Sequence, residues 1–217
     1  MKNKVKPNLE QLDDRIVPST IHGSTPSGLT WSYNDVTQKL VINGTSHNDT
    51  FSLWNGGQDV WLVDGNSGGR AFDTGAKLGL SLKIQVNDGA SGAVKNDWIA
   101  DYLPYYTYGS CVISDSNSGN EILQAGSYKD TLIGGEGNNC LIDGFDISAA
   151  GATLVGGTGV NTFITSTGAF GSTQVVDYDP TQDTIINMNP YQGNSMYISG
   201  GDPMTVTLNG QIVWQSV

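Results

Sequence analysis

A nine-residue repeat across residues 116–164 constrains the fold of this chain more than any other feature of its sequence. When the segment is aligned in steps of nine, with one longer step of 13 residues at 143–155, the eighth position is always apolar. The residues in this position are Leu123, Leu132, Leu141, Leu154 and Phe163. Because one short unit cannot bury such a residue alone, the pattern predicts units that stack into a continuous core.

Each unit is expected to contain a six-residue turn and a three-residue strand, so that two units make one coil of about 18 residues. Alternate residues of a strand point to opposite faces. The eighth residue therefore faces inward, whereas its neighbours face outward; these neighbours include Thr131, Ile133, Cys140 and Ile142. Glycines in the turns permit positive φ angles and a close approach between neighbouring coils.

Short β-segments precede the repeat, at 29–33, 39–42, 50–53, 60–63 and 80–86. Each shows alternation or β-branched residues and is bounded by a turn pair such as Asn-Gly or Gly-Gly. Ordinary hairpins explain these neighbouring segments, and so do more degenerate copies of the repeat. The 29 glycines, together with few helix-forming residues, predict very little helix.

The repeat resembles the GGxGxDxUx nonapeptide of hemolysin-type (RTX) proteins, whose turns bind calcium in a parallel β-roll. Residues 134–137 and 156–159 keep the three glycines of that motif. Residues 44–51 resemble the GTxGNDTL unit that opens such arrays, and residues 176–185 resemble the segment that often follows the last repeat. The sequence departs from the motif at its metal position, where only Asp49 and Asp130 keep the aspartate.

This resemblance implies an all-β fold, a right-handed parallel β-solenoid of the β-roll or β-helix kind. Residues 29–110 would form degenerate coils and residues 111–190 the RTX-like roll. The remaining residues, 191–217, would form a short C-terminal capping hairpin from strands at 204–208 and 211–214, joined at Asn209-Gly210. A cap is expected because an uncovered end exposes a free sheet edge.

Residues 1–28 are expected to form an extended or disordered leader. Within it, residues 9–18 resemble the LExLExR-x-x-P leader found near the start of exported proteins of planctomycete bacteria. The resemblance implies that the protein is secreted or displayed at the cell surface. Hydropathy alone does not predict export, because no apolar signal-peptide core follows the basic N-terminus.

The charge of the chain excludes some classes of partner. A formal net charge of −11 argues against nucleic acid, because phosphate binding needs a basic face. No apolar run reaches the length of a transmembrane helix, so we expect no transmembrane segment. The acidic residues beyond Lys129 form either a solvated face or a set of charges that a divalent cation balances.

Calcium is the cofactor that the RTX resemblance implies, and the alternation of turns divides its candidate ligands between two edges. Glu121, Asn139 and Asn161 share one edge, where the stacked asparagines could hydrogen-bond to one another without metal. Asp130, Asp143 and Asp146 belong to the other edge, which offers more of the six to eight oxygens that calcium takes. We expect weak binding there, with a dissociation constant of about 10⁻⁴–10⁻³ M.

Two groups of aspartates have alternative interpretations without metal. Asp130 could instead cap the backbone of its own turn. Asp177, Asp179 and Asp183 are expected to close the array through hydrogen bonds within a turn.

Aromatic residues cluster around Pro104. They either pack as a plug over irregular coils or form a surface on which sugar rings stack, and the candidates for sugar binding are Trp98, Tyr105, Tyr106 and Tyr108. Trp54 and Trp61 belong either to the same face or to the core.

The two cysteines are not expected to form a disulfide. If Cys111 aligns with Thr131, both Cys111 and Cys140 occupy the seventh position and point outward from opposite sheets. Their separation would then exceed the Cα spacing of about 4.4–6.8 Å that a disulfide requires.

No catalytic constellation is visible. His22 lies in the leader, His47 lies in a turn, and the chain has no HExxH, GxSxG or phosphate-binding loop. We therefore expect no enzyme but a structural or adhesive module, with the extracellular matrix, the cell envelope or a glycan surface as partner. The alternative is a carbohydrate-binding or polysaccharide-processing β-helix that uses the aromatic cluster at 98–108.

Overall fold

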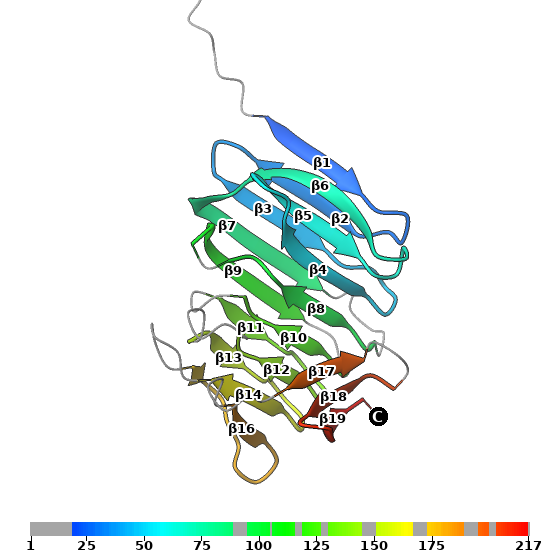
Figure 1. The fold of residues 1–217 in the computed structure, drawn as a ribbon, viewed down its shortest axis with the longest axis vertical. Coiled ribbons are helices and arrows are strands. Elements are labelled where there is room, and N and C mark those ends of the chain that lie inside the picture. The colour runs from blue at the N-terminus through cyan, green and yellow to red at the C-terminus, as the bar shows by residue number, and fades with distance from the viewer. Residues whose placement is uncertain are drawn as a thin grey trace, which may run out of the picture.

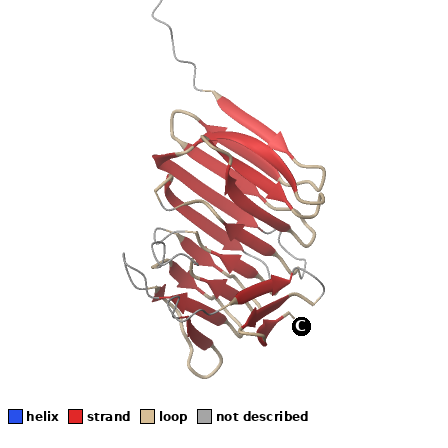
Figure 2. Cartoon of the chain, in the orientation of Figure 1, coloured by secondary structure: helices blue, strands red, loops and turns tan. Residues whose placement is uncertain are grey.

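The fold is all-β. The computed structural model describes residues 19–88, 95–104, 106–115, 119–126, 130–144, 151–166, 173–188, 195–199 and 203–216. Throughout these residues there is no helix, and most strands are parallel and belong to two large sheets (Figures 1 and 2). The described part of the chain accordingly contains no helix able to cross a membrane.

Sheet A contains eight strands. In sheet order they are β1 (Thr20–Ser24), β2 (Thr30–Asn34), β3 (Lys39–Asn43), β7 (Gly79–Asp88), β9 (Tyr108–Asp115), β11 (Thr131–Ile133), β13 (Thr153–Val155) and β15 (Gln174–Val175). The first three strands are antiparallel, and every pair from β3–β7 onward is parallel.

Sheet B also contains eight strands. In the same direction they are β6 (Arg70–Lys77), β5 (Asp59–Asp64), β4 (Thr50–Asn55), β8 (Trp98–Asp101), β10 (Ile122–Gln124), β12 (Cys140–Ile142), β14 (Thr162–Ser166) and β16 (Thr184–Met188). Strands β4, β5 and β6 are antiparallel, and every pair from β4–β8 onward is parallel. From β7 to β16 the chain alternates between sheets A and B, and the strands stack along the long axis of the molecule (Figure 1).

The nine-residue repeat predicts the pairing of these strands correctly. Leu123 pairs with Leu141 and Leu141 with Phe163 in sheet B, while Leu132 pairs with Leu154 in sheet A. These five side chains are all fully buried, and Thr131 is only half-buried. The 13-residue step therefore counts as one unit, because it changes the length of a turn without shifting the register.

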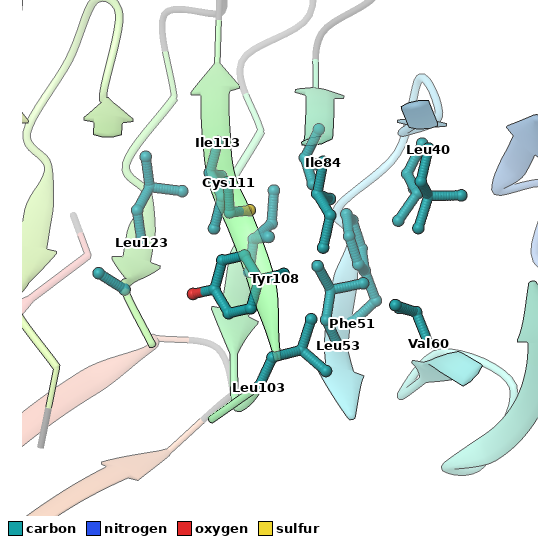
Figure 3. Packing of buried hydrophobic residues seen from close by; sticks show 14 of the residues in the cluster. Leu40, Phe51, Leu53, Val60, Ile84, Leu103, Tyr108, Cys111, Ile113 and Leu123 are labelled. Carbon is teal, nitrogen blue, oxygen red and sulfur yellow. The ribbon is translucent and has the colours of Figure 1, made fainter. Parts of the chain in front are cut away.

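The core lies between the two sheets. Figure 3 shows side chains from both sheets meeting there, among them Phe51 and Leu123 of sheet B and Ile84 and Ile113 of sheet A. In each sheet these residues form columns, because the parallel register places Ile113 beside Leu132 and Leu123 beside Ile99. Burying such columns removes apolar area from water and is the main favourable contribution to folding.

The part of the molecule that precedes the repeat contains both ordinary hairpins and stacked parallel strands, the two arrangements that the sequence allowed. All five predicted segments are strands, and hairpins join β2 to β3 and β4 to β5. Stacking of parallel strands begins with β3–β7 and β4–β8. Strand β1 lies within residues 1–28, so the predicted leader contains a strand of sheet A, while residues 1–18 lie outside the described residues.

The C-terminal strands form a third sheet, with β17 (Met196–Ser199), β18 (Thr205–Leu208) and β19 (Gln211–Gln215) in antiparallel order. The predicted hairpin at Asn209-Gly210 is present as β18–β19. Its position differs from the prediction, because the sheet packs on the outer face of sheet B instead of the open end (Figure 1). Val206 and Trp214 are buried there against Ile122, Cys140 and Ile142.

Both cysteines are free, as expected, but the predicted orientation of Cys111 is wrong. Thr131 pairs with Val112, so the assumed alignment is off by one residue. Cys111 points into the core between sheets A and B, as Figure 3 shows, and Cys140 points outward beneath the C-terminal sheet. The two side chains lie in different apolar clusters, so they are not bonded to each other.

Stacked turns explain two of the glycines. Gly157 has a φ of +81°, and a Cβ atom there would lie 1.8 Å from the backbone oxygen of Gly135 in the neighbouring turn. Gly159 has a φ of +119°, and its Cβ would lie 2.0 Å from the oxygen of Gly137. Only glycine satisfies both the left-handed conformation and this close approach.

Candidate metal centre

Buried polar residues form a column at the edge where the chain passes from sheet A to sheet B. Each member lies directly before a strand of sheet B, and from one end to the other they are Asp49, Asp97, Glu121, Asn139, Asn161 and Asp183. The parallel register of sheet B places these residues next to one another in space.

Hydrogen bonds along this column join neighbouring turns. The amide of Glu121 donates to Asn139 Oδ1 at 3.2 Å, the amide of Asn139 donates to Asn161 Oδ1 at 3.3 Å, and the amide of Asn161 donates to Asp183 Oδ1 at 2.8 Å. The predicted hydrogen bonding between stacked asparagines is confirmed. Asn139 and Asn161 therefore use their side-chain oxygens within the protein.

A second set of carboxylates faces the part of this column that contains Asp49, Asp97 and Glu121. Asp88 and Asp115 end the strands β7 and β9, and they pair directly with each other in sheet A. In the repeats that follow, the same place is taken by glycine, as at Gly134. The backbone of Gly44 lies close to Asp88, because a Cβ atom on Gly44 would be 1.9 Å from Asp88 Oδ1.

Together these residues form two groups of carboxylates with Asp97 in common. The first group is Asp49, Asp88 and Asp97, and the second is Asp97, Asp115 and Glu121; in each, one oxygen per residue lies within 4.8 Å of the others. The side chains are at most 2% exposed. Oxygens on opposite sides of a bound calcium ion are about 4.6–5.2 Å apart, so the spacing fits a calcium site.

Several of these oxygens accept no hydrogen bond from the described residues. They are Oδ1 and Oδ2 of Asp88, Oδ2 of Asp97, and Oε1 and Oε2 of Glu121. Asp49 differs, because the amide and hydroxyl of Thr45 donate to its carboxylate at 2.5 and 3.0 Å. Buried polar atoms are normally hydrogen-bonded, so uncompensated oxygens at this edge require protons or a cation.

Burial governs the ionisation of the cluster. Desolvation raises the pKa of Glu121 to about 11, and the neighbouring carboxylate of Asp115 adds to the effect. Desolvation, followed by the charges of nearby aspartates, also raises the pKa of Asp88. Desolvation likewise raises the pKa of Asp97. Without a cation, the carboxyl groups of Glu121 and Asp88 are therefore held largely as neutral acids.

In the described part of the chain, one basic side chain reaches into the cluster. Lys95 is 1% exposed, its Nζ lies 3.8 Å from Asp88 Oδ1, and it donates a hydrogen bond to the carbonyl oxygen of Thr45 at 2.6 Å. Among the described residues, five carboxylates thus face a single ammonium group, which leaves an excess of acidic groups in a buried environment.

The opposite edge contains the aspartates predicted as the main calcium ligands. Their carboxylate oxygens accept hydrogen bonds from other groups of the protein. Asp130 accepts from the hydroxyl of Tyr108 at 2.8 Å and from the amides of Cys111 and Gly126 at 3.2 and 2.9 Å. It is therefore fixed by strand β9 and by its own turn.

Asp143 is held in the same way. It accepts hydrogen bonds from the amides of Gly144, Gly151 and Ala152 and from the hydroxyls of Ser166 and Thr173. Asp146 lies outside the described residues. Among the described residues of this edge, the structure brings together carboxylates and their donors but no group of three possible ligands.

The acidic segment after the repeat is organised by hydrogen bonds, as predicted. Asp177 accepts from the amides of Gly156 and Gly157 at 2.8 and 2.7 Å, and Asp183 accepts from the amides of Asn161 and Asp179 at 2.8 and 2.9 Å. Asp183 thus caps one amide of its own turn and one of the neighbouring turn, whereas both amides that Asp177 caps belong to the neighbouring turn.

The aromatic candidates for sugar binding are dispersed. Tyr108 is fully buried between the sheets and offers no ring face at the surface, Tyr106 is exposed, and Tyr105 lies outside the described residues. Trp98 is half-buried on the outer face of sheet B. Beside it, the rings of Trp54 and Tyr102 lie 4.8 Å apart.

These rings border a shallow hollow of about 260 Å³ on the outer face of sheet B. Trp54 and Trp61, which pair across β4 and β5, are 47% and 37% exposed, so they extend this outer face and do not belong to the core. The surface of the hollow is almost entirely apolar. Trp98 and Val63 contribute to its walls, together with the small polar residue Ser52.

Comparisons with known proteins add no assignment: the chain matches no protein-family profile, no curated protein and no solved structure. The residues of the metal centre that sequence reasoning missed are Asp88, Asp97, Asp115 and Lys95. A signal for two of them was present, because Asp88 and Asp115 replace the glycine that opens the turn in later repeats.

Proposed function

We propose that this protein is a parallel β-solenoid of the RTX type that acts as a secreted or cell-surface structural or adhesive module and binds calcium weakly. The single observation that carries the proposal is the buried cluster of five carboxylates, in which oxygens of Asp88, Asp97 and Glu121 accept no hydrogen bond from the described residues. The parallel strands from β7 to β16, which alternate between sheets A and B, support the solenoid part of the proposal.

The chemistry of the cluster favours a hard divalent cation. All candidate ligands are oxygens, which calcium prefers, and residues of neighbouring turns provide them, so one ion would tie successive turns together. The cluster contains no histidine, and both cysteines lie elsewhere, so a zinc site of nitrogen or sulfur ligands does not fit. The calcium site is thus proposed for the edge that contains Asp97 and Glu121. This proposal replaces the site at Asp130 and Asp143 that the sequence predicts.

Weak affinity follows from the state of the cluster without metal. Protons and Lys95 compete with calcium for the same oxygens, so the dissociation constant is proposed to lie at about 10⁻⁴–10⁻³ M, the range of extracellular modules. Such a site is filled outside the cell, where calcium is abundant, which agrees with the export that the leader resemblance implies. The proposed partner is the extracellular matrix, the cell envelope or a glycan surface.

Titration calorimetry and thermal melts with calcium and with chelator test the calcium site. Calcium at about 100 times the dissociation constant should raise the free energy of unfolding by about 2.7 kcal/mol. Asp97→Asn removes a ligand common to both groups and should weaken binding at least tenfold. Glu136→Gln is the matched control, because Glu136 lies in a turn of the same edge but is exposed. Undetectable binding at millimolar calcium would refute the proposal.

Carbohydrate binding is the second candidate, and the exposed pair of Trp54 and Tyr102 beside the hollow favours it. Aromatic faces suit the apolar faces of sugars. Glycan-array binding that Trp54→Ala abolishes, and that Tyr178→Ala at the exposed Tyr178 after β15 leaves unchanged, would support it. If no glycan on the array binds, carbohydrate binding is rejected and only the structural or adhesive function remains proposed.

A further inference from the structure

The two carboxylate groups of the metal centre differ in one respect, which is their relation to Lys95. Among the described residues, Lys95 is the one basic residue whose side chain is buried. Its Nζ lies 3.8 Å from Asp88, a member of the first group, and donates to Thr45 O at 2.6 Å. The amide and the hydroxyl of Thr45 in turn donate hydrogen bonds to Asp49, which belongs to the same group.

The contacts of the Lys95 ammonium are those of a bound cation. It meets a carboxylate oxygen and a backbone carbonyl oxygen, and these are also the ligands that calcium uses in proteins. Through them Lys95 joins the turn before β8 to the turn before β4, as an ion between two turns would. The ammonium therefore stands in for a metal ion at the first group.

In the second group, the described residues show no ion pair to Glu121 comparable to that of Lys95 with Asp88. Its members Asp97, Asp115 and Glu121 have their nearest oxygens within 4.8 Å of one another. The charges that act on Glu121 come from Asp115, Asp97 and Asp88, whereas the positive charge of Lys95 acts on Asp88 and Asp97. Both side-chain oxygens of Glu121 accept no hydrogen bond from the described residues.

We infer that the metal centre has two cation positions, of which the first, at Asp49, Asp88 and Asp97, is filled by the Lys95 ammonium. The second, at Asp97, Asp115 and Glu121, is open to one external divalent cation. This inference rests on the proposed calcium-binding function and adds to it the stoichiometry and the identity of the ligands. A calcium ion at the first position would have to displace a tethered cation, so only the second position binds.

Calcium binding to the full-length protein, counted by titration calorimetry and by equilibrium dialysis, tests the inference. We expect one ion per chain for the wild type, none for Glu121→Gln, and two for Lys95→Met, which frees the first position. The control is Lys83→Met, since Lys83 is exposed on β7, and it should still bind one ion. The double variant Lys95→Met, Glu121→Gln should bind one ion.

A further variant keeps the test decisive if Lys95→Met does not fold. Asp49 belongs to the first group alone, so Asp49→Asn should leave one ion bound with affinity changed less than about threefold, whereas Glu121→Gln abolishes binding. Two ions in the wild type, one ion in folded Lys95→Met, or loss of binding in Asp49→Asn would overturn the inference and leave the proposed function standing. No ion in the wild type would overturn both.

Discussion

The backbone amide of Asn139 donates a hydrogen bond to the side-chain oxygen of Asn161, 22 residues further along the chain, at 3.3 Å. The two residues lie at the same point of neighbouring turns, and the amide of Glu121 reaches Asn139 in the same way. The repeat is thus maintained by polar contacts at its edge as well as by the apolar columns between the sheets.

The inward column can be tested by truncation. Leu132→Ala leaves a cavity between Ile113 and Leu154 and should lower the free energy of unfolding by about 2–5 kcal/mol. Thr131→Ala, one residue earlier and only half-buried, should change it by less than about 0.5 kcal/mol. Urea unfolding followed by circular dichroism measures both values. Equal losses would mean that the nine-residue register is incorrect.

The close approach of stacked turns predicts different costs for two similar glycines. Gly157 and Gly68 have φ angles of +81° and +76°, so alanine at either site costs about 1–2 kcal/mol of conformational strain. Only Gly157 has a neighbour, the backbone oxygen of Gly135, within contact of the added Cβ. Gly157→Ala should therefore destabilise the protein by about 1–3 kcal/mol more than Gly68→Ala in thermal melts. Similar losses would contradict the stacking.

The stability of the calcium-free protein should decrease as the pH rises. The pKa of Glu121 is raised from 4.5 to about 11 in the folded state, and those of Asp88 and Asp97 are also raised, so the folded state binds protons more tightly than the unfolded state. Their contribution is complete below the unfolded pKa values and is lost as the pH rises through the folded ones.

In chelator, the melting temperature should be lower at pH 9 than at pH 6. Excess calcium should reduce this decrease because the ion replaces the protons. The Glu121→Gln variant, whose side chain does not ionise, should show a smaller decrease than the wild type. A melting temperature that rises between pH 6 and pH 9 in chelator would contradict the assigned environment of these carboxyl groups.

Thiol labelling reports on the C-terminal sheet. Both cysteines are buried, and burial raises the pKa of each thiol, so both should react slowly in the wild type. Val206→Asp buries a charge beside Cys140 and should detach the third sheet, so that Cys140 reacts at least about tenfold faster, the change expected for about 1.4 kcal/mol of easier opening.

In the same variant, Cys111 should keep its slow rate, because it lies between sheets A and B. Tyr197→Asp, on the exposed side of the same C-terminal sheet, is the control and should leave both rates unchanged. Faster labelling of both cysteines in Val206→Asp would indicate that the whole protein unfolds and that the third sheet does not open independently.

The sequence predicts the strands and their pairing well wherever the repeat is regular. An apolar residue every ninth position determines which side chain faces inward at Leu132 and Leu141, because a shift of one residue would turn the whole strand over. The prediction is wrong at Cys111, where the strand β9 is longer than three residues and its inward residue, Ile113, lies one position later than assumed.

The site was harder to predict because its ligands come from different turns. Asp88 and Asp115 do not follow the nine-residue motif, and only the pairing of β7 with β9 places them together. The position of the C-terminal sheet likewise depends on apolar residues far away in the chain, such as Cys140 and Ile164, which the repeat pattern alone would leave in contact with solvent.

The direction in which the strands stack determines how the molecule would respond to a pulling force. Strands follow one another along the long axis (Figure 1), so the hydrogen bonds between them lie along that axis as well. Tension applied between the two ends would load these bonds one strand pair at a time and peel the molecule from its ends. Because each strand of sheets A and B pairs only with its neighbours, the inner strands would keep their pairing while the outer ones extend.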